Sequence, residues 1–240
     1  HHCPPLPSLS ATGYRALRVF WEAGGTHAFV INNDLRIWPE TYETLLSVQQ
    51  ETGAWFVTGT GVTEGEFHTF CESGDAPGAR MPSYPLPGPD FSCYLITKEA
   101  HTYAPFDEQF IPAFTEDIDI HRRYMLSSLG DKIFGTGLPF WHVNDGSSTL
   151  KRIDPARAKA IEAQVNEICR PYFARKWGGA CNQERYIRPF DPTSACDGVT
   201  TPELFERVRN GRPALDGVVI PPGTPDGAQN TTIPSLTDRG

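Results

Sequence analysis

The stretch that decides the fold is His27-Ala-Phe-Val-Ile-Asn-Asn-Asp34, in which an apolar run ends abruptly in two amides and a carboxylate. The apolar part predicts a buried β-strand over residues 27–32. Ligands of an open α/β sheet bind at the carboxyl ends of its strands, where Asp34 is expected to lie. A carboxylate there suits Mg²⁺ or Mn²⁺, which prefer oxygen ligands. Asn and Asp are also common turn residues, so the motif alone leaves a simple turn open.

Helix and strand patterns alternate around this strand. Apolar residues at helical spacing predict a helix over 10–25 and another over 39–53, with Pro39 suited to its first turn. A strand at 54–58 completes a β-α-β unit, which predicts parallel strands in an α/β sheet. Residues 59–90 are rich in Gly, Pro and Ser and are expected to form a long loop. The other predicted elements are a strand at 91–97 and helices at 115–129, 154–178 and 202–210.

The composition narrows the class of protein. The chain has 240 residues, of which 39% are hydrophobic, as expected for a globular protein. A formal net charge of −8 argues against a nucleic-acid binder, which would present a basic face, but leaves a nucleotide ligand open. No segment approaches the run of about 20 apolar residues that spans a bilayer. The six cysteines include no CxxC pair, which disfavours a zinc ribbon and leaves disulfides open.

Three polar groups could carry chemistry: Asn33-Asp34, Glu116-Asp117 and Trp141-His142. Asp34 and His142 could hold a divalent cation that neutralises a leaving diphosphate, because a metal stabilises developing negative charge. Asp117 could accept the proton of an attacking hydroxyl as general base. Each group also has a simpler interpretation. Acidic residues in a first turn stabilise the helix dipole, and a lone histidine is more often structural than a ligand.

Several short motifs follow one another along residues 10–190. They are Asn-Asn-Asp (32–34), Phe-Asp-Glu-Gln-Phe (106–110), Glu-Asp-Ile-Asp (116–119) before Arg122-Arg123, Trp-His (141–142) with Gly-Ser-Ser-Thr (146–149), and Lys-Trp-Gly-Gly (176–179). In this order they resemble the family 2 glycosyltransferases of the GT-A fold. The resemblance implies a GT-A-like α/β fold with a mixed, mostly parallel sheet flanked by helices. It also implies transfer of a sugar from a nucleotide-sugar donor to a hydroxyl of a glycan, lipid or protein acceptor.

The resemblance assigns the donor and metal residues. Asp34 matches the last acid of the family's DxD-type motif, which binds Mn²⁺ or Mg²⁺ on the donor diphosphate. Asn32 stands where the first acid often is, and Asn33 lies between the two, so both are expected to contact the donor. His142 matches a histidine that completes the metal site in many relatives.

The resemblance also assigns the catalytic and acceptor residues. Asp117 matches the catalytic base of the family's Glu-Asp pair, which implies inversion at the anomeric carbon, and Glu116 is expected to help orient the acceptor. Asp107, Glu108 and Trp141 are expected to contact the acceptor. The long segment 59–90 could shape acceptor choice.

The main departure from the family lies at the start of the chain. Relatives place roughly two strand-helix units before the metal motif, whereas about 25 residues precede the strand here. We therefore expect a GT-A-like domain that lacks its N-terminal nucleotide-binding part. The expected organisation is a disordered leader (1–9), this partial domain (10–190), and a flexible Pro/Gly-rich tail (191–240) with one short helix.

Two other functions fit part of the pattern. One is a non-catalytic glycosyltransferase-like protein that binds glycans or a partner chain. The other is a nucleotidyltransferase, which also uses a carboxylate-bound metal on an α/β sheet but usually needs a Gly-rich loop and a nearby basic residue. The sequence leaves a cytoplasmic and a Golgi-associated location equally open.

Overall fold

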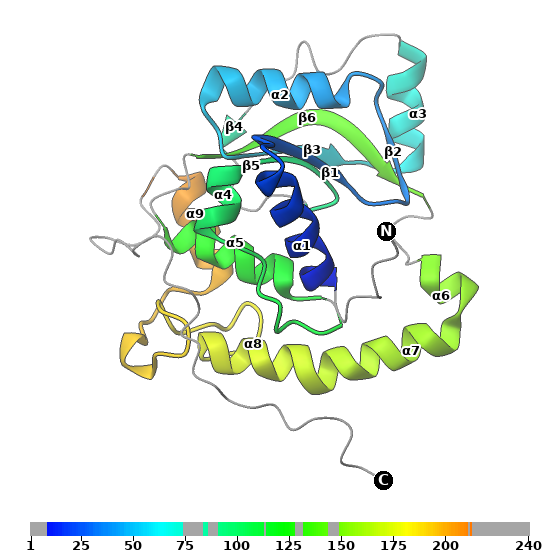
Figure 1. The fold of residues 1–240 in the computed structure, drawn as a ribbon. Helices are drawn as coiled ribbons and strands as arrows, with labels where there is room; N and C mark the ends of the chain where they lie inside the picture. Colours follow the sequence, from blue (N-terminus) through cyan, green and yellow to red (C-terminus); the bar gives the residue numbers. More distant parts are fainter. Residues whose placement is uncertain are drawn as a thin grey trace.

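A mixed β-sheet with helices on both faces forms the centre of the molecule (Figure 1). The computed structural model describes residues 9–73, 84–85, 91–112, 114–127, 132–143, 149–210 and 212. Within these residues the strands are β1 (His27–Ile31), β2 (Leu35–Ile37), β3 (Phe56–Gly61), β4 (Tyr84–Pro85), β5 (Cys93–Thr97) and β6 (Ile133–His142). Their order is β1-β5-β3-β6-β2, and β4 also pairs with β6. The α/β class predicted from the sequence is confirmed.

The prediction that the sheet is mostly parallel is wrong. Among the described strands, only β3 and β6 pair in parallel, whereas β1–β5, β3–β5, β2–β6 and β4–β6 are antiparallel. β1 and β3 do run in the same direction, as the β-α-β pattern predicts. However, β5 lies between them and is antiparallel to both. Sequence periodicity locates a strand but does not say which strand becomes its neighbour, so this insertion could not be foreseen.

The sequence did not predict β6, the longest strand among the described residues. Gly135, Gly137 and Pro139 interrupt its apolar pattern, and such residues are uncommon in a central strand. The structure accommodates Pro139 at an irregularity, because the register between β3 and β6 shifts between Thr58 and Thr60, which lies opposite the proline. This irregularity allows a proline inside the sheet.

The predicted helices are confirmed in type and approximate position. They are α1 (Leu9–Glu22), α2 (Thr41–Thr52), α5 (Glu116–Leu126), α7 (Pro155–Gln164) with α8 (Arg170–Trp177), and α9 (Thr201–Arg209). Two short helices were not predicted, α4 (Lys98–Tyr103) and α6 (Thr149–Ile153). Pro39 is not in the first turn of α2, because Thr41 donates to the Trp38 carbonyl and closes a turn ahead of the helix. The expectation of one long loop over 59–90 is also wrong, since β3 extends to Gly61 and α3 (Glu64–Ser73) follows.

The long helix predicted over 154–178 is continuous but irregular. Asp154 caps its start, with the carboxylate accepting a hydrogen bond from the Arg157 N–H at 2.9 Å. A π-helical segment, Val165–Cys169, separates α7 from α8. Pro171 follows this segment and has no N–H to donate, which explains why regular α-helical bonding fails there.

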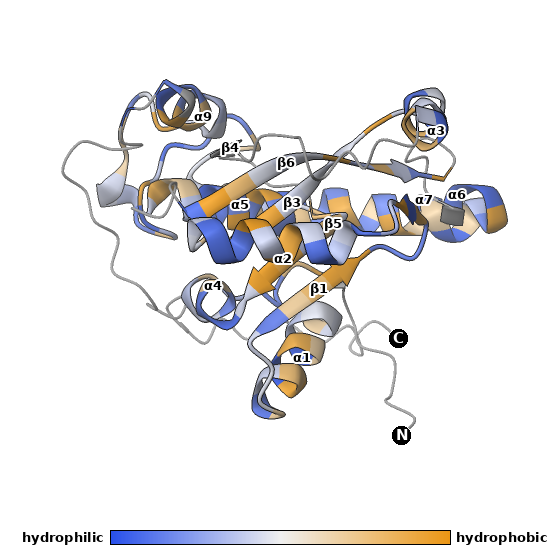
Figure 2. Ribbon diagram, turned by 90° about the horizontal axis from the view of Figure 1, so that it is seen from above, coloured by the Kyte–Doolittle hydropathy of each residue, from blue (hydrophilic) through white to orange (hydrophobic). Residues whose placement is uncertain are grey.

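Both faces of the sheet are buried, by different helices. On β5, Tyr94 and Ile96 pack with α1, α4 and α5, whereas Leu95 between them packs with α2. Figure 1 shows the same division, with α2 on one face and α1, α4 and α5 on the other. Figure 2 shows a mostly hydrophobic β1, whose Val30 and Phe29 pack on opposite faces of the sheet, and a mixed α2, as expected for a helix with one solvated face.

The side of α5 that faces away from the sheet packs against the C-terminal helices. Its Met125 and Leu126 belong to a buried cluster with Phe173 of α8 and Leu204 of α9. The described residues beyond 190 therefore lie against α5 as far as α9, although the predicted domain boundary itself stays a prediction. Residues 1–8, 211 and 213–240, which hold nearly all of the expected leader and the end of the expected tail, lie outside the described residues.

Two further observations bear on the organisation of the chain. β1 ends the strand order, so in the part of the chain that the structure describes its outer edge carries no paired strand. The expected loss of an N-terminal part stays a prediction. No described helix has the length and apolarity needed to cross a membrane.

His101 is a buried titratable group in the contact between α1 and α4. Its ring lies 5.2 Å from that of Tyr14 and 6.2 Å from that of Trp21, and Nε2 has no hydrogen-bond partner among the described residues. Burial, and then the charge of Arg123, lowers the pKa of His101 to about 4 from 6.5. The folded protein therefore keeps this imidazole neutral at a pH where the unfolded chain protonates it.

We predict that His101→Phe flattens the pH dependence of stability between pH 6.5 and 4. In this window the unfolded chain binds a proton at residue 101 that the folded state does not, so wild-type stability falls as the pH falls. A shift of this size corresponds to on the order of 3 kcal/mol. Urea unfolding at several pH values measures the effect, with the exposed His68→Gln as control. Parallel curves for wild type and His101→Phe would contradict the prediction.

Candidate functional site

The two predicted metal ligands come together at one end of the sheet. Asp34 follows β1, and β2 then pairs with β6 so that Leu35 lies opposite His142. The Val143 N–H donates to the Asp34 carbonyl at 2.9 Å and fixes the backbone between them. As a result, Asp34 Oδ1 lies 3.6 Å from His142 Nδ1, although the two residues are far apart in the sequence.

The geometry of this pair fits a divalent cation. His142 Nδ1 is a buried atom that finds no hydrogen-bond partner in the described part of the chain. The distance of 3.6 Å to Asp34 is long for a hydrogen bond. Neighbouring ligands of an octahedral cation with bonds of about 2.1 Å lie roughly 3 Å apart, so a small closing movement would bring both atoms to a shared ion. An orphaned nitrogen facing a carboxylate is the arrangement expected of two ligands.

A cation held here would depend on further ligands. The described residues contain no group of three or more His, Cys, Asp and Glu side chains arranged around a metal. The side chains of His142 and Asp34 are 26% and 28% exposed, so oxygens from solvent or a substrate can approach the two side chains, although the Nδ1 atom itself is covered. Magnesium commonly keeps several waters and binds through one or two carboxylates plus substrate phosphates. Asp34 and His142 therefore suit a shared site better than a closed protein cage.

Asn32 and Asn33, the predicted donor contacts, lie exposed beside this pair. The Asn32 N–H donates to the Ser92 carbonyl at 2.9 Å, which continues the pairing of β1 with β5. Their side chains are thus available to a ligand, and their donor role stays a prediction.

Glu116 and Asp117, the predicted catalytic residues, begin α5 as expected. Glu116 is buried, and its Oε2 has no hydrogen-bond partner within the described residues. Burial, and then the charge of Asp117, raises the pKa of Glu116 to about 7. Asp117 is half-buried, and its Oδ1 accepts a hydrogen bond from the Ile118 N–H at 2.8 Å. The pair thus combines a buried carboxyl group whose pKa is raised with a more accessible acid.

The backbone that leads into α5 is strained. Phe114 and Thr115 have φ angles of +71° and +72°, which is unfavourable for residues with a β-carbon. Thr115 Oγ1 is buried and makes no hydrogen bond to the described residues. Strained residues of this kind cost about 1–3 kcal/mol each and cluster at functional sites. The strain therefore points to the start of α5 independently of the Glu-Asp motif.

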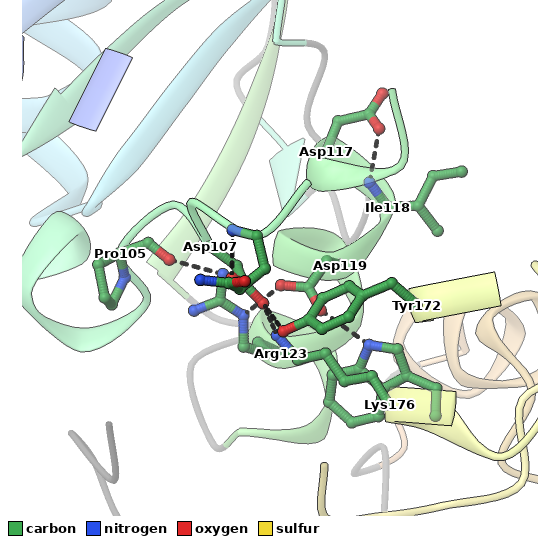
Figure 3. Close-up of polar contacts among 10 residues, drawn as sticks. Pro105, Asp107, Asp117, Ile118, Asp119, Arg123, Tyr172 and Lys176 are labelled. Atoms are coloured by element: carbon green, nitrogen blue, oxygen red, sulfur yellow. Dashed lines mark hydrogen bonds and ion pairs between the residues drawn. The ribbon is translucent and has the colours of Figure 1, made fainter. Parts of the chain in front are cut away.

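A buried cluster of charges joins α5 to α8 and to the loop after α4 (Figure 3). The fully buried Lys176 of α8 contacts Asp107 at 2.7 Å and Asp119 at 3.0 Å. Asp119 also accepts hydrogen bonds from Arg123 at 2.9 Å and from the Trp177 indole at 2.8 Å. In Figure 3 Asp117 lies apart from this cluster. The sequence analysis missed Asp119, although the four-residue spacing from Asp119 to Arg123 was a usable signal.

The predicted acceptor residues differ in accessibility. Asp107 is buried, and its carboxylate accepts hydrogen bonds from Lys176, from the Tyr172 hydroxyl at 2.8 Å and from the Gln109 N–H at 2.9 Å. Burial alone would raise the pKa of Asp107, but the Lys176 charge and these hydrogen bonds hold it below its usual value. This position favours a structural role for Asp107, and the acceptor role stays a prediction.

The two other acceptor residues lie elsewhere. Glu108 is half-buried in the same loop. Trp141 is buried next to His142, and its ring centroid lies 6.0 Å from that of His68 on α3. The Arg36 guanidinium lies 5.6 Å from the centre of the Trp141 ring. Trp141 is therefore covered by α3, which belongs to the segment expected to shape acceptor choice.

A ring contact connects the segment beside Asp34 and His142 with α5. Phe91 and Ser92 lie in the turn just before β5, and the Phe91 ring lies 5.1 Å from that of His121. His121 and Asp117 are four residues apart on α5 and so share one side of the helix. Phe91 thus joins the strand end beside Asp34 to the helix that carries the Glu-Asp pair.

The comparisons with known proteins do not assign the chain to a family. No protein-family model matches it, and no curated protein matches it at a significant level. The function must therefore be argued from the residues and their geometry.

We predict that Lys176→Met destabilises the fold by about 3–5 kcal/mol, because it leaves two buried carboxylates without their shared cation. Urea unfolding at neutral pH measures the change. The matched control is Lys159→Met on the exposed surface of α7, expected to change stability by no more than about 0.5 kcal/mol. A loss below about 1 kcal/mol for Lys176→Met would show that the cluster is not structurally essential.

Proposed function

We propose that this chain is a metal-dependent, inverting glycosyltransferase of the GT-A type that resembles family 2. The single observation that carries the proposal is the orphaned His142 Nδ1 facing the Asp34 carboxylate at 3.6 Å. A buried imidazole nitrogen without a hydrogen-bond partner is costly, and a ligand that satisfies it removes the cost. A Mn²⁺ or Mg²⁺ ion carrying a donor diphosphate is the ligand that also satisfies Asp34.

The second support is the start of α5. Asp117 is the more accessible carboxylate of the Glu-Asp pair, whereas Glu116 is buried with a raised pKa. In the proposed reaction Asp117 accepts the proton of an acceptor hydroxyl while the oxygen of that hydroxyl forms a bond to the anomeric carbon. The bond from that carbon to the diphosphate breaks on the opposite side, and a nucleoside diphosphate leaves. The bound cation would stabilise the charge that develops on the diphosphate.

The division of roles between the two acids follows from their surroundings. A general base must lie within reach of the acceptor hydroxyl, which favours the more accessible Asp117 over the buried Glu116. The raised pKa of Glu116 populates its protonated form near neutral pH, and this form can donate a hydrogen bond as well as accept one. We assign Glu116 to orienting the acceptor, because its free oxygen lies beside the proposed base.

We predict that Asp117→Asn lowers sugar transfer at least about 100-fold and leaves donor binding intact, since the amide keeps the shape of the side chain but cannot take a proton. Turnover is measured as nucleoside diphosphate released from a panel of uridine, guanosine and thymidine diphosphate sugars with Mn²⁺. Donor binding is measured by calorimetry with the donor that the wild type uses.

The control for this prediction is Asp197→Asn, which changes an exposed acid outside the site and should retain wild-type turnover. Sugar transfer that survives in Asp117→Asn would exclude Asp117 as the base. Release of pyrophosphate instead of nucleoside diphosphate would indicate a nucleotidyltransferase. Binding of a sugar nucleotide without any turnover by the wild type would indicate a non-catalytic relative.

A further inference from the structure

We propose that Ser92 is the positioning residue of the Asp34–His142 cation site. Its Oγ lies 2.9 Å from His142 Nε2, on the opposite side of the imidazole from the nitrogen that faces Asp34. This inference rests on the proposed function, because it concerns how the same pair is held ready for a cation. No motif singled out Ser92, which lies within the strand predicted over 91–97 and just ahead of the observed β5.

The hydrogen bond determines which imidazole nitrogen can bind a cation. A neutral imidazole carries one proton, so one nitrogen donates and the other offers a lone pair. When Ser92 Oγ accepts the Nε2 proton, the lone pair is on Nδ1, facing Asp34. Histidines that bind metals usually donate their other N–H to an oxygen in this way, which fixes the tautomer and the ring orientation.

The backbone of Ser92 holds the other half of the site. Its carbonyl accepts a hydrogen bond at 2.9 Å from the N–H of Asn32, which lies two residues before Asp34. The adjoining residues Ile31 and Cys93 are paired between β1 and β5. One residue thus contacts the segment that carries Asp34 through its carbonyl and His142 through its hydroxyl. Because both contacts come from one residue, a shift of Ser92 would change the separation of the two ligands.

A purely structural role for Ser92 predicts a different effect of losing its hydroxyl. Were the hydroxyl needed only to satisfy Nε2, its loss would affect folding stability and leave Mn²⁺ affinity unchanged. The positioning role predicts the reverse, because loss of the outer partner of a metal-binding histidine typically weakens metal affinity 10–100-fold.

The test is a Mn²⁺ titration followed by electron paramagnetic resonance, with Mn²⁺ alone and with inorganic pyrophosphate as a diphosphate probe. We expect Ser92→Ala to raise the Mn²⁺ dissociation constant about 10–100-fold with little change in melting temperature. Ser92→Thr retains the hydroxyl and should restore binding. The matched control is Ser47→Ala, whose hydroxyl bonds to Glu51 on the exposed side of α2. Asp34→Asn should abolish binding.

A second measurement does not depend on any Ser92 variant. In the wild-type chain with Mg²⁺ and pyrophosphate, ¹⁵N spectra should show His142 protonated at Nε2 and unprotonated at Nδ1. The opposite tautomer would overturn the inference.

The outcomes separate this inference from the proposed function. If the wild type binds Mn²⁺ and Asp34→Asn does not, but Ser92→Ala binds as tightly as the wild type, the role of Ser92 is refuted and the cation site stands. If the wild type binds Mn²⁺ neither alone nor with pyrophosphate, the proposed cation site fails and the role of Ser92 fails with it.

Discussion

The buried ammonium of Lys176 is the interaction on which the rest of the candidate site depends. It lies between Asp107, in the loop after α4, and Asp119, in the first turns of α5, and it comes from α8. A single buried charge would be prohibitively unfavourable, but here two carboxylates face two cations, Lys176 and Arg123, and hydrogen bonds occupy their oxygens. The cluster thereby joins three segments. Because Asp117 lies two residues before Asp119, the position of the proposed base follows from this cluster.

The site has two parts, and the sheet holds one of them. The ends of β1 and β6 and the start of β5 meet at Asp34, His142 and Ser92, where backbone hydrogen bonds fix each segment. The other part is the strained start of α5, where Glu116 is buried with a raised pKa and Asp117 is more accessible. The contact of Phe91 with His121 connects them. A group transfer needs both parts, since one neutralises a leaving group and the other accepts a proton.

The features predicted correctly from the sequence are local ones. The apolar run before Asn32 defined β1, and Asp154-Pro155 defined the start of α7, because a strand or a helix cap depends on neighbouring residues. Features set by distant residues were missed. β6 contains two glycines and a proline that its partners accommodate, and the insertion of β5 between β1 and β3 is a matter of pairing.

The candidate site shows the same limit. The sequence predicted Asp34, His142, Glu116 and Asp117 through their order along the chain, and the structure places the first two together and the last two at a helix start. That Asp107 and Asp119 share Lys176 could not be predicted from the sequence, because the three side chains meet only after α5 and α8 pack. Ser92 was invisible for the same reason, since its importance lies in a contact across 50 residues of chain.

The most direct test of the proposed cation site is a crystal structure of the chain grown with Mn²⁺ and pyrophosphate, with anomalous diffraction used to locate manganese. We predict one manganese peak within coordination distance of both Asp34 Oδ1 and His142 Nδ1, with pyrophosphate oxygens completing its ligands. Manganese bound elsewhere, with no density between Asp34 and His142, would contradict the site and with it the proposed glycosyltransferase chemistry.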